Sequence, residues 1–327
     1  MKTKVLIALL MVVYMSIICL ASEVMPGPPE TGYGSAEKYI TREVKTITFG
    51  SILDGTMTYI IVPKKLMYGD SAPVVIQLHG SMLIGPEIYW ETILHLAYQG
   101  CIVIHPQFNQ SFPKVVQDTD QNKVMDRAVK SVDQALKSVE KHVRRDRIFL
   151  YGHSLGGLMA MCWEGKGGCK AAGRVLASPN VDPNCQAGAF QPKIKVLDFN
   201  AFGKKVTGPV VIFGGDKDTI SPPDQLASAA NCLVNARPKK VYMIKSSTNN
   251  GRSLLADHMA ATNDTGFLPE AIMSKIGGKG RLDTIDYRVF HAALDAMIHD
   301  QKVKINWNMG KWSDGTSIPA PEDITVK

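Results

Sequence analysis

One segment of the sequence has the residue types and spacing of a covalent catalyst: Gly152-His153-Ser154-Leu155-Gly156-Gly157. In a Gly-x-Ser-x-Gly turn, the serine lies at a sharp corner between a strand and a helix, and the glycines remove side chains that would clash there. The apolar run Arg147-Ile148-Phe149-Leu150 predicts the strand, and residues 158–163 predict the helix. We therefore predict that Ser154 is a nucleophile rather than a serine in a purely structural turn.

A serine hydroxyl needs a base that accepts its proton and a third group that orients the base. We predict that His258 is the base, because it follows the last expected strand on a loop that can approach Ser154. The orienting acid is expected in the turn at residues 215–222, which also follows a strand. This turn offers Asp216 and Asp218. We favour Asp218 as the catalytic acid and expect Asp216 to support the turn.

Acyl transfer also requires two N–H donors that stabilise the oxyanion of the tetrahedral intermediate. The backbone N–H of Leu155, directly after the nucleophile, is the first predicted donor. The turn His79-Gly80-Ser81 follows a buried strand, so the N–H of Ser81 is the second, with Met82 as the alternative. The apolar residues after this turn are candidates for a substrate-binding pocket, chiefly Met82, Tyr89 and Trp90.

The elements expected to position these residues alternate along the chain. Residues 45–49 and 56–62 flank the turn signal Asp54-Gly55, which predicts an antiparallel hairpin. Continuous apolar runs then predict buried strands, at residues 73–78, 101–104, 148–151, 174–177, 209–213 and 240–245. Helical patterns lie between and after them, at residues 90–99, 124–143, 158–163, 226–234 and 287–299. The alternation predicts an α/β fold, with a mostly parallel central sheet, helices on both faces and no large cap domain.

The N-terminus has the pattern of a secretory signal. Lys2 and Lys4 precede an apolar run over residues 5–20, and small residues follow. An uncleaved membrane anchor is the alternative and would be the only membrane contact, but Tyr14 and Ser16 interrupt the run. We expect a secreted, extracellular protein with a signal peptide (1–21), an N-terminal segment (22–44), one catalytic domain (45–311) and a loosely packed C-terminal tail (312–327).

Composition excludes several classes of function. The formal net charge of +7 is modest, and the lysines and arginines form no stripe interleaved with aromatic residues, so no nucleic-acid partner is expected. The absence of a C-x-x-C pair and of matching histidine spacing argues against a metal site. We expect neither a metal nor an organic cofactor, and no obligate protein partner is evident.

Secretion would change how cysteines and asparagines behave. Cys101 lies in an apolar run and is expected to be a free core thiol. Disulfides are expected among the other cysteines of the mature chain, in pairings that sequence alone does not choose: Cys162, Cys169, Cys185 and Cys232. Two sequons, at Asn109 and Asn263, would accept glycans in a eukaryotic host.

The chain order serine, aspartate, histidine resembles the α/β-hydrolase superfamily, as do the turn at residues 78–81, the serine corner and the acid turn at residues 215–222. The resemblance covers nearly the whole mature chain. Within the superfamily, the compact form is similar to dienelactone-hydrolase-like, chlorophyllase-like and secreted cutinase-like polyester-hydrolase esterases. Dienelactone hydrolases usually carry cysteine where this chain has Ser154, and polyester hydrolases usually carry methionine where it has Leu155.

The resemblance implies a serine hydrolase that cleaves carboxylic esters through an acyl-enzyme. A hydrophobic small-molecule or polymeric ester, such as a lipid or polyester, is the expected substrate. A peptidase or amidase with the same triad is one alternative, although it usually has a larger domain that gates the substrate. A noncatalytic binding protein on the same scaffold is another, because fold does not fix function.

Overall fold

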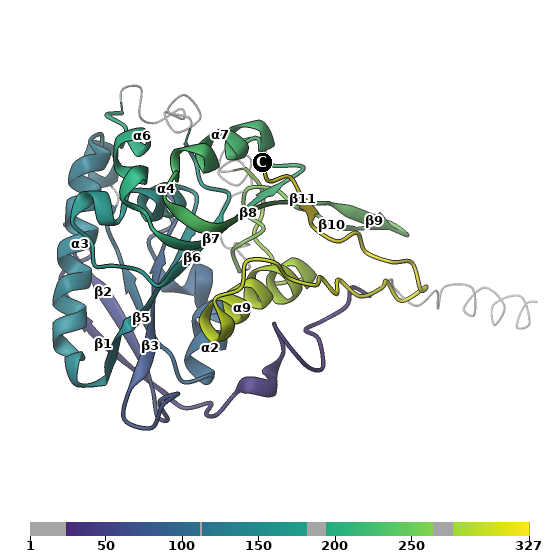
Figure 1. The fold of residues 1–327 in the computed structure, drawn as a ribbon, viewed down its shortest axis with the longest axis horizontal. Helices are drawn as coiled ribbons and strands as arrows, with labels where there is room; N and C mark the ends of the chain where they lie inside the picture. Colours follow the sequence, from purple (N-terminus) through teal and green to yellow (C-terminus); the bar gives the residue numbers. More distant parts are fainter. Residues whose placement is uncertain (1–23, 112, 182–193, 264–276, 327) are drawn as a thin grey trace, which may run out of the picture.

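A central sheet organises the computed structural model, which describes residues 24–111, 113–181, 194–263 and 277–326 (Figure 1). Within these residues, nine strands pair in the order β1-β2-β4-β3-β5-β6-β7-β8-β11. The strands from β4 to β8 run parallel, whereas β1, β2 and β11 pair antiparallel with their neighbours. Their bounds are β1 Val44–Phe49, β2 Thr58–Pro63, β3 Ala72–Leu78, β4 Ile102–Pro106, β5 Val143–His153, β6 Gly173–Ala177, β7 Gly208–Gly215, β8 Ala236–Ile244 and β11 Glu322–Asp323. The predicted α/β class with a mostly parallel sheet is confirmed.

Helices cover both faces of the sheet. The larger ones are α2 Trp90–Tyr98, α3 Gln121–Ser138, α4 Leu155–Cys162, α7 Pro223–Cys232 and α9 Ala292–Asp300, the last preceded by the π-helix η7 Asp286–His291. Side chains alternate along each strand, so that Ile76 belongs to the buried cluster that includes residues of α3, α4 and α7, whereas the adjacent Val75 belongs to the cluster that includes residues of α2 and α9. Two buried cores therefore hold the sheet from opposite sides.

Shorter elements connect these layers. One-turn helices lie at η1 Ala36–Lys38, η2 Pro86–Tyr89, η3 Lys114–Gln117, η4 Glu140–His142, η5 Glu164–Lys166, α6 Phe199–Phe202 and η6 Gly203–Lys205, and a small hairpin pairs β9 Ser247–Asn249 with β10 Arg252–Leu254. The stretch at 178–208 contains α6 and η6, while residues 182–193 lie outside the described residues.

The helix expected over residues 124–143 is the amphipathic α3, but its bounds were wrong at both ends. It starts earlier, because the Asp120 carboxylate caps it by accepting the Asn122 N–H at 3.0 Å. It ends at Ser138, and η4 then leads into β5, which starts at Val143. Charged residues such as Arg144 and Asp146 extend this strand beyond the apolar run that predicted it.

The C-terminal tail differs from the expectation of loose packing. Trp312 is 2% exposed and Ile318 is 5% exposed, so the tail contributes to the core. Glu322 and Asp323 pair with Met243 and Tyr242 and add β11 to the edge of the sheet. Apolar residues spaced widely among Pro, Gly and Asp gave no strand pattern in the sequence.

The predicted signal peptide, residues 1–21, lies outside the described residues. Among those that are described, no helix combines the length and apolar character that crossing a membrane requires.

Candidate active site

Ser154 lies between β5 and α4, at the corner that the glycine spacing predicted. Its backbone has φ 53° and ψ −118°, a strained combination for a residue with a side chain. A Cβ on Gly152 would lie 2.4 Å from the Gly156 carbonyl oxygen, and one on Gly156 would lie 2.1 Å from that of Leu78. The two glycines are therefore required for the chain to turn this tightly against β3.

The three predicted catalytic side chains form one hydrogen-bonded series. The Nε2 of His258 lies 2.8 Å from Ser154 Oγ, and its Nδ1 lies 3.0 and 3.1 Å from the two carboxylate oxygens of Asp218. Because a carboxylate only accepts, Nδ1 carries the proton and Nε2 is left to accept the serine hydroxyl proton. All three residues are buried. This is the geometry of a serine with its general base and orienting acid.

Asp218 is held as a carboxylate by its surroundings. Burial alone would raise its pKa, but the His258 ring and the Ser221 N–H outweigh burial and lower the pKa of Asp218 below its usual value. Its Oδ1 accepts the N–H groups of Ile220 and Ser221, at 2.9 and 2.8 Å. Asp216 points elsewhere, accepting the N–H and hydroxyl of Ser246 at 3.0 and 2.5 Å. The structure thus brings Asp218, and not Asp216, to the histidine.

The two predicted oxyanion donors lie on adjoining segments. The Gly156 N–H donates to the His79 carbonyl at 3.0 Å, which ties the start of α4 to the end of β3. The backbone N–H groups of Ser81 and Leu155 donate to no acceptor in the described part of the chain. They therefore remain available to a ligand, as the prediction requires.

The turn that carries Ser81 is closed and strained. The Leu83 N–H donates to the Gly80 carbonyl at 3.0 Å, and Met82 has φ 65°, in the left-handed region that few residues with a side chain occupy. The Met82 N–H is already engaged, because it donates to Asn109 Oδ1 at 3.3 Å. Ser81 is therefore better placed than Met82 to supply the second donor.

Tyr89 and His153 connect this turn to the base loop, which is the loop that carries His258. The Gly80 N–H donates to the Tyr89 hydroxyl at 2.8 Å, and that hydroxyl lies 2.9 Å from His153 Nδ1. The Nε2 of His153 lies 2.7 Å from the His258 carbonyl oxygen. Burial lowers the pKa of His153 to about 3, so the ring is neutral. Its one proton must then be on Nε2, since the carbonyl can only accept, and Nδ1 receives the Tyr89 hydroxyl proton.

The three residues proposed for substrate binding have different environments. Tyr89 is fully buried under the turn and presents no surface to a substrate. Trp90 begins α2 and is half-buried against the core. Met82 is 46% exposed, so of the three it has the most apolar surface open to a ligand. No cluster of His, Cys, Asp and Glu in the described ranges is arranged to hold a metal ion.

The expected pair of disulfides is wrong. Cys162 and Cys169 are free thiols, and Cys162 is buried in the core against the sheet. Cys185 lies outside the described residues, so any bridge from it to Cys232 stays a prediction. Cys101 is a free buried thiol, as predicted, and burial raises its pKa.

The two sequons also differ from each other. Asn109 is 3% exposed, and its amide nitrogen donates to Asp118 Oδ2 at 3.3 Å, so this fold leaves no room for a glycan there. Asn263 is half-buried, and the rest of its sequon lies outside the described residues, so glycosylation at Asn263 stays a prediction.

Three supporting residues escaped sequence reasoning. Asn109 was considered only as a glycan acceptor, Tyr89 only as a pocket residue, and His153 only as part of the serine-corner motif. Their roles depend on tertiary contacts between residues that are 9 to 105 positions apart, which no sequence motif reveals. The one available signal was a polar residue at Asn109, three residues after the end of a buried strand.

Comparison with known proteins identifies the family. A family model described as Chlorophyllase matches residues 51–221, more than half of the chain. Among curated proteins, none matches the sequence.

Solved structures are similar at low sequence identity. Est1E from Butyrivibrio proteoclasticus is 16% identical with a TM-score of 0.47, over 61% of this chain and 88% of that one. Esterase B from Lactobacillus Rhamnosis is 18% identical with a TM-score of 0.44, over 63% of this chain and 76% of that one. A second Est1E structure has ferulic acid bound, with 18% identity and a TM-score of 0.47 over 61% of this chain and 89% of that one. On the family match, together with the sheet order described above, the chain belongs to the chlorophyllase family and is a carboxylic ester hydrolase of the α/β-hydrolase type.

Proposed function

We propose that the protein is a secreted serine esterase that cleaves a hydrophobic carboxylic ester through an acyl-enzyme on Ser154. The observation that carries the proposal is the hydrogen-bonded series from Ser154 through His258 to Asp218, at 2.8 and 3.0 Å. The series begins at a strained corner that directs the serine out of the sheet, beside two N–H groups that have no partner in the described residues.

Acylation follows from this geometry. Ser154 Oγ attacks the ester carbonyl carbon while His258 Nε2 takes the hydroxyl proton, and Asp218 stabilises the ring as it becomes positively charged. The carbonyl oxygen gains the negative charge, which the N–H groups of Ser81 and Leu155 are placed to receive. The intermediate then collapses, the alkoxy group leaves with the proton from His258, and the acyl group stays on Ser154.

Deacylation repeats these steps with water as the nucleophile. His258 Nε2 takes a proton from water, the resulting hydroxide adds to the acyl carbon, and the same two N–H groups stabilise the second oxyanion. Collapse releases the acid and returns the proton to Ser154 Oγ. No step calls for a group other than these side chains, backbone donors and water.

The surface beside the oxyanion turn, the turn at residues 80–83 that carries Ser81, supports a hydrophobic substrate. Met82 belongs to this turn and leaves 46% of its surface exposed. A flexible, polarisable methionine side chain suits an apolar group of variable shape. We propose that the apolar part of the ester contacts Met82, which Met82→Ser would test: KM should rise more for octanoate than for acetate esters.

Secretion rests on the sequence of residues 1–21 alone. The test is expression of the full chain in a eukaryotic secretory host, followed by N-terminal sequencing of the protein in the medium. Cleavage close to residue 21 would support the proposal. Retention of the intact chain in the membrane fraction would replace it with the anchor alternative.

The central test compares the mature chain with its Ser154→Ala variant on p-nitrophenyl esters from acetate to palmitate. We expect the variant to lose ~10³-fold or more in kcat, because it has no nucleophile to acylate. A fluorophosphonate probe should label the wild type and not the variant. If both folded proteins are equally inert or equally active, Ser154 is not the nucleophile, and the proposed mechanism fails.

A further inference from the structure

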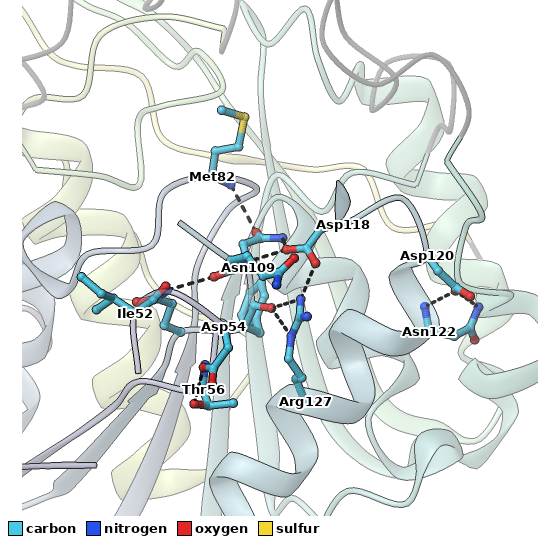
Figure 2. Close-up of polar contacts among 12 residues, drawn as sticks. Ile52, Asp54, Thr56, Met82, Asn109, Asp118, Asp120, Asn122 and Arg127 are labelled. Carbon is cyan, nitrogen blue, oxygen red and sulfur yellow. Dashed lines mark hydrogen bonds and ion pairs between the residues drawn. The ribbon is translucent and has the colours of Figure 1, made fainter. Parts of the chain in front are cut away.

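We propose that Asn109 is a positioning residue of the oxyanion hole. Its side chain holds the strained turn that presents the Ser81 N–H, through a hydrogen bond to the next residue, Met82. The inference rests on the proposed function, because it assigns a role in oxyanion stabilisation to a residue that does not touch the reacting atoms. Figure 2 shows the side chains that carry it.

Asn109 contacts the turn directly. Met82 donates its backbone N–H to Asn109 Oδ1 at 3.3 Å, and it does so at φ 65°. A left-handed conformation at a residue with a side chain costs free energy and persists where the surroundings enforce it. Asn109 supplies such a contact from outside the turn, three residues after the end of β4. The direction of the Ser81 N–H, one residue earlier, depends on that conformation.

The orientation of the Asn109 amide is determined by the chemistry of its neighbours. An asparagine side chain can present either oxygen or nitrogen to a neighbour. Here Asn109 Nδ2 faces Asp118 Oδ2 at 3.3 Å, and a carboxylate offers no proton. The nitrogen must therefore face Asp118, and the oxygen must face the Met82 N–H.

Asp118 is itself held in place by hydrogen bonds. Arg127, from α3, donates to Asp118 Oδ1 at 2.6 Å, and the Gln110 N–H donates to Oδ2 at 2.7 Å. Arg127 also donates to the Phe108 carbonyl oxygen, at 2.9 Å from Nε and 2.7 Å from Nη2. The carboxylate of Asp118 is 5% exposed, so water does not compete strongly for it.

The backbone of Asn109 is held on its other side. Gln107 Nε2 donates to the carbonyl oxygens of Asn109 and Ile52, at 3.0 and 2.7 Å. A Cβ on Gly55 would lie 2.9 Å from the Asn109 carbonyl carbon, so the loop between β1 and β2 packs directly against this backbone. Asn109 is thus fixed between that loop and the Asp118–Arg127 pair, and only its amide oxygen extends to the turn.

The test uses three variants of the mature chain: Asn109→Ala, the isosteric Asn109→Asp and a matched control, Asn122→Ala. Asn122 also donates from its amide to an aspartate, Asp120 Oδ1 at 3.2 Å, but at the start of α3 and away from the turn (Figure 2). For each variant we would measure kcat and KM for p-nitrophenyl butyrate, the inhibition constant of phenylboronic acid, and the urea midpoint.

The Ser154 oxygen adds to the boron atom of phenylboronic acid and forms a tetrahedral adduct. The affinity of phenylboronic acid therefore reports on the oxyanion site rather than on substrate binding. We expect Asn109→Ala to lower kcat and boronate affinity by the same ~10-fold, with KM within about twofold, because misplaced catalytic donors act on the transition state. Asn122→Ala should match the wild type in all three kinetic quantities.

Asn109→Asp keeps the size and the acceptor but places a carboxyl group beside Asp118 and near the developing oxyanion. Once ionised, that carboxylate repels both Asp118 and the oxyanion, so the loss of kcat should grow from pH 6 to pH 8. In Asn109→Ala, by contrast, kcat should be lower by a constant factor. Even if Asn109→Ala fails to fold, the pH profile of Asn109→Asp relative to that of the wild type decides the question.

The outcomes separate the inference from the proposed function. An active wild type with a folded Asn109→Ala of equal kcat overturns the positioning role alone. So does a fall in kcat without loss of boronate affinity, an equal fall in Asn122→Ala, or an Asn109→Asp pH profile parallel to the wild type. A wild type that hydrolyses no ester and resists the fluorophosphonate probe overturns both.

Discussion

The serine corner and the oxyanion turn lie next to each other, yet they are held in place by different means. The corner is built from backbone: Ser154 takes φ 53° because Gly152 and Gly156 allow β5, α4 and β3 to meet within ordinary contact distance. The turn at Met82 is equally unusual in its backbone, with φ 65°, but it has no glycine at that position. Side chains from outside the turn hold it through hydrogen bonds, Asn109 at Met82 and Tyr89 at Gly80.

This difference indicates where each region is sensitive to substitution. A region held by close backbone contacts has no free volume, so adding one methyl group must displace whole strands or helices. A region held by side-chain hydrogen bonds can lose one bond and still keep its approximate shape. The corner should therefore fail completely when it is changed, whereas the turn should lose activity in graded steps.

The largest effect is expected for Gly156→Ala. The new Cβ would lie 2.1 Å from the Leu78 carbonyl oxygen, which is backbone and cannot rotate away. Overpacking typically costs 1–3 kcal/mol, so we expect the free energy of unfolding to fall by about 3 kcal/mol. Misplacement of Ser154 should lower kcat by more than ~100-fold. Urea unfolding and ester hydrolysis measure the two effects.

Gly27→Ala is the control for that prediction, because a Cβ there meets nothing within 4 Å. It should leave stability and kcat unchanged. An active, stable Gly156→Ala enzyme would show that β3 and α4 can separate, and the contrast between the corner and the turn would be lost.

A smaller effect is expected for Tyr89→Phe. It removes the hydroxyl that accepts the Gly80 N–H and donates to His153, and leaves both partners buried. Unsatisfied buried polar groups cost about 1–3 kcal/mol, so we expect a loss of ~2 kcal/mol in the free energy of unfolding. Because both the turn and the base loop lose a support, kcat should fall by roughly tenfold.

Tyr242→Phe provides the comparison for Tyr89→Phe. Its hydroxyl also donates inside the protein, to the Val303 carbonyl at 3.2 Å, but this acceptor lies in the segment after α9 and not in the turn or the loop of His258. Stability should fall somewhat while kcat stays unchanged. If both variants lowered kcat equally, the effect of Tyr89 would be one of general stability rather than of support to the turn.

The same contrast explains how much of the molecule could be predicted from its sequence. The strands, the serine corner and the acid turn can each be recognised from residues within ten positions of one another. The α/β class and the grouping of Ser154, Asp218 and His258 could therefore be predicted from the sequence. Asn109 and Tyr89 act through contacts with the turn that depend on tertiary packing, and their local sequence suggested a glycan site and a pocket wall instead. The edge strand β11 was missed for a similar reason, because it pairs with β8, about 80 positions earlier.

The smallest effect concerns the pH dependence of stability. It distinguishes the turn from the buried carboxyl groups near His258. The support from Tyr89 and His153 is uncharged, since burial lowers the pKa of His153 to about 3 and raises that of Tyr89. Near His258, burial raises the pKa of Asp257 to about 6 and that of Asp283 to about 7, while burial and the nearby Asp283 carboxylate raise that of Asp286.

These raised pKa values predict the sign of the pH dependence. Between the ordinary carboxyl pKa of 3.8 and the raised values, the folded state binds more protons than the unfolded state. Their stabilising contribution is therefore fully present below pH 3.8 and is lost as pH rises towards 7. We expect the urea midpoint to fall from pH 5 to pH 8.

Asp286→Asn keeps an oxygen for the Asp283 N–H, at 2.9 Å in the wild type, but cannot ionise. It should raise the midpoint at pH 8 and flatten the slope, whereas Tyr89→Phe should lower the midpoint equally at both pH values. A slope that Asp286→Asn leaves unchanged would place the titrating groups elsewhere, and a Tyr89→Phe loss confined to one pH would show that the turn is coupled to them.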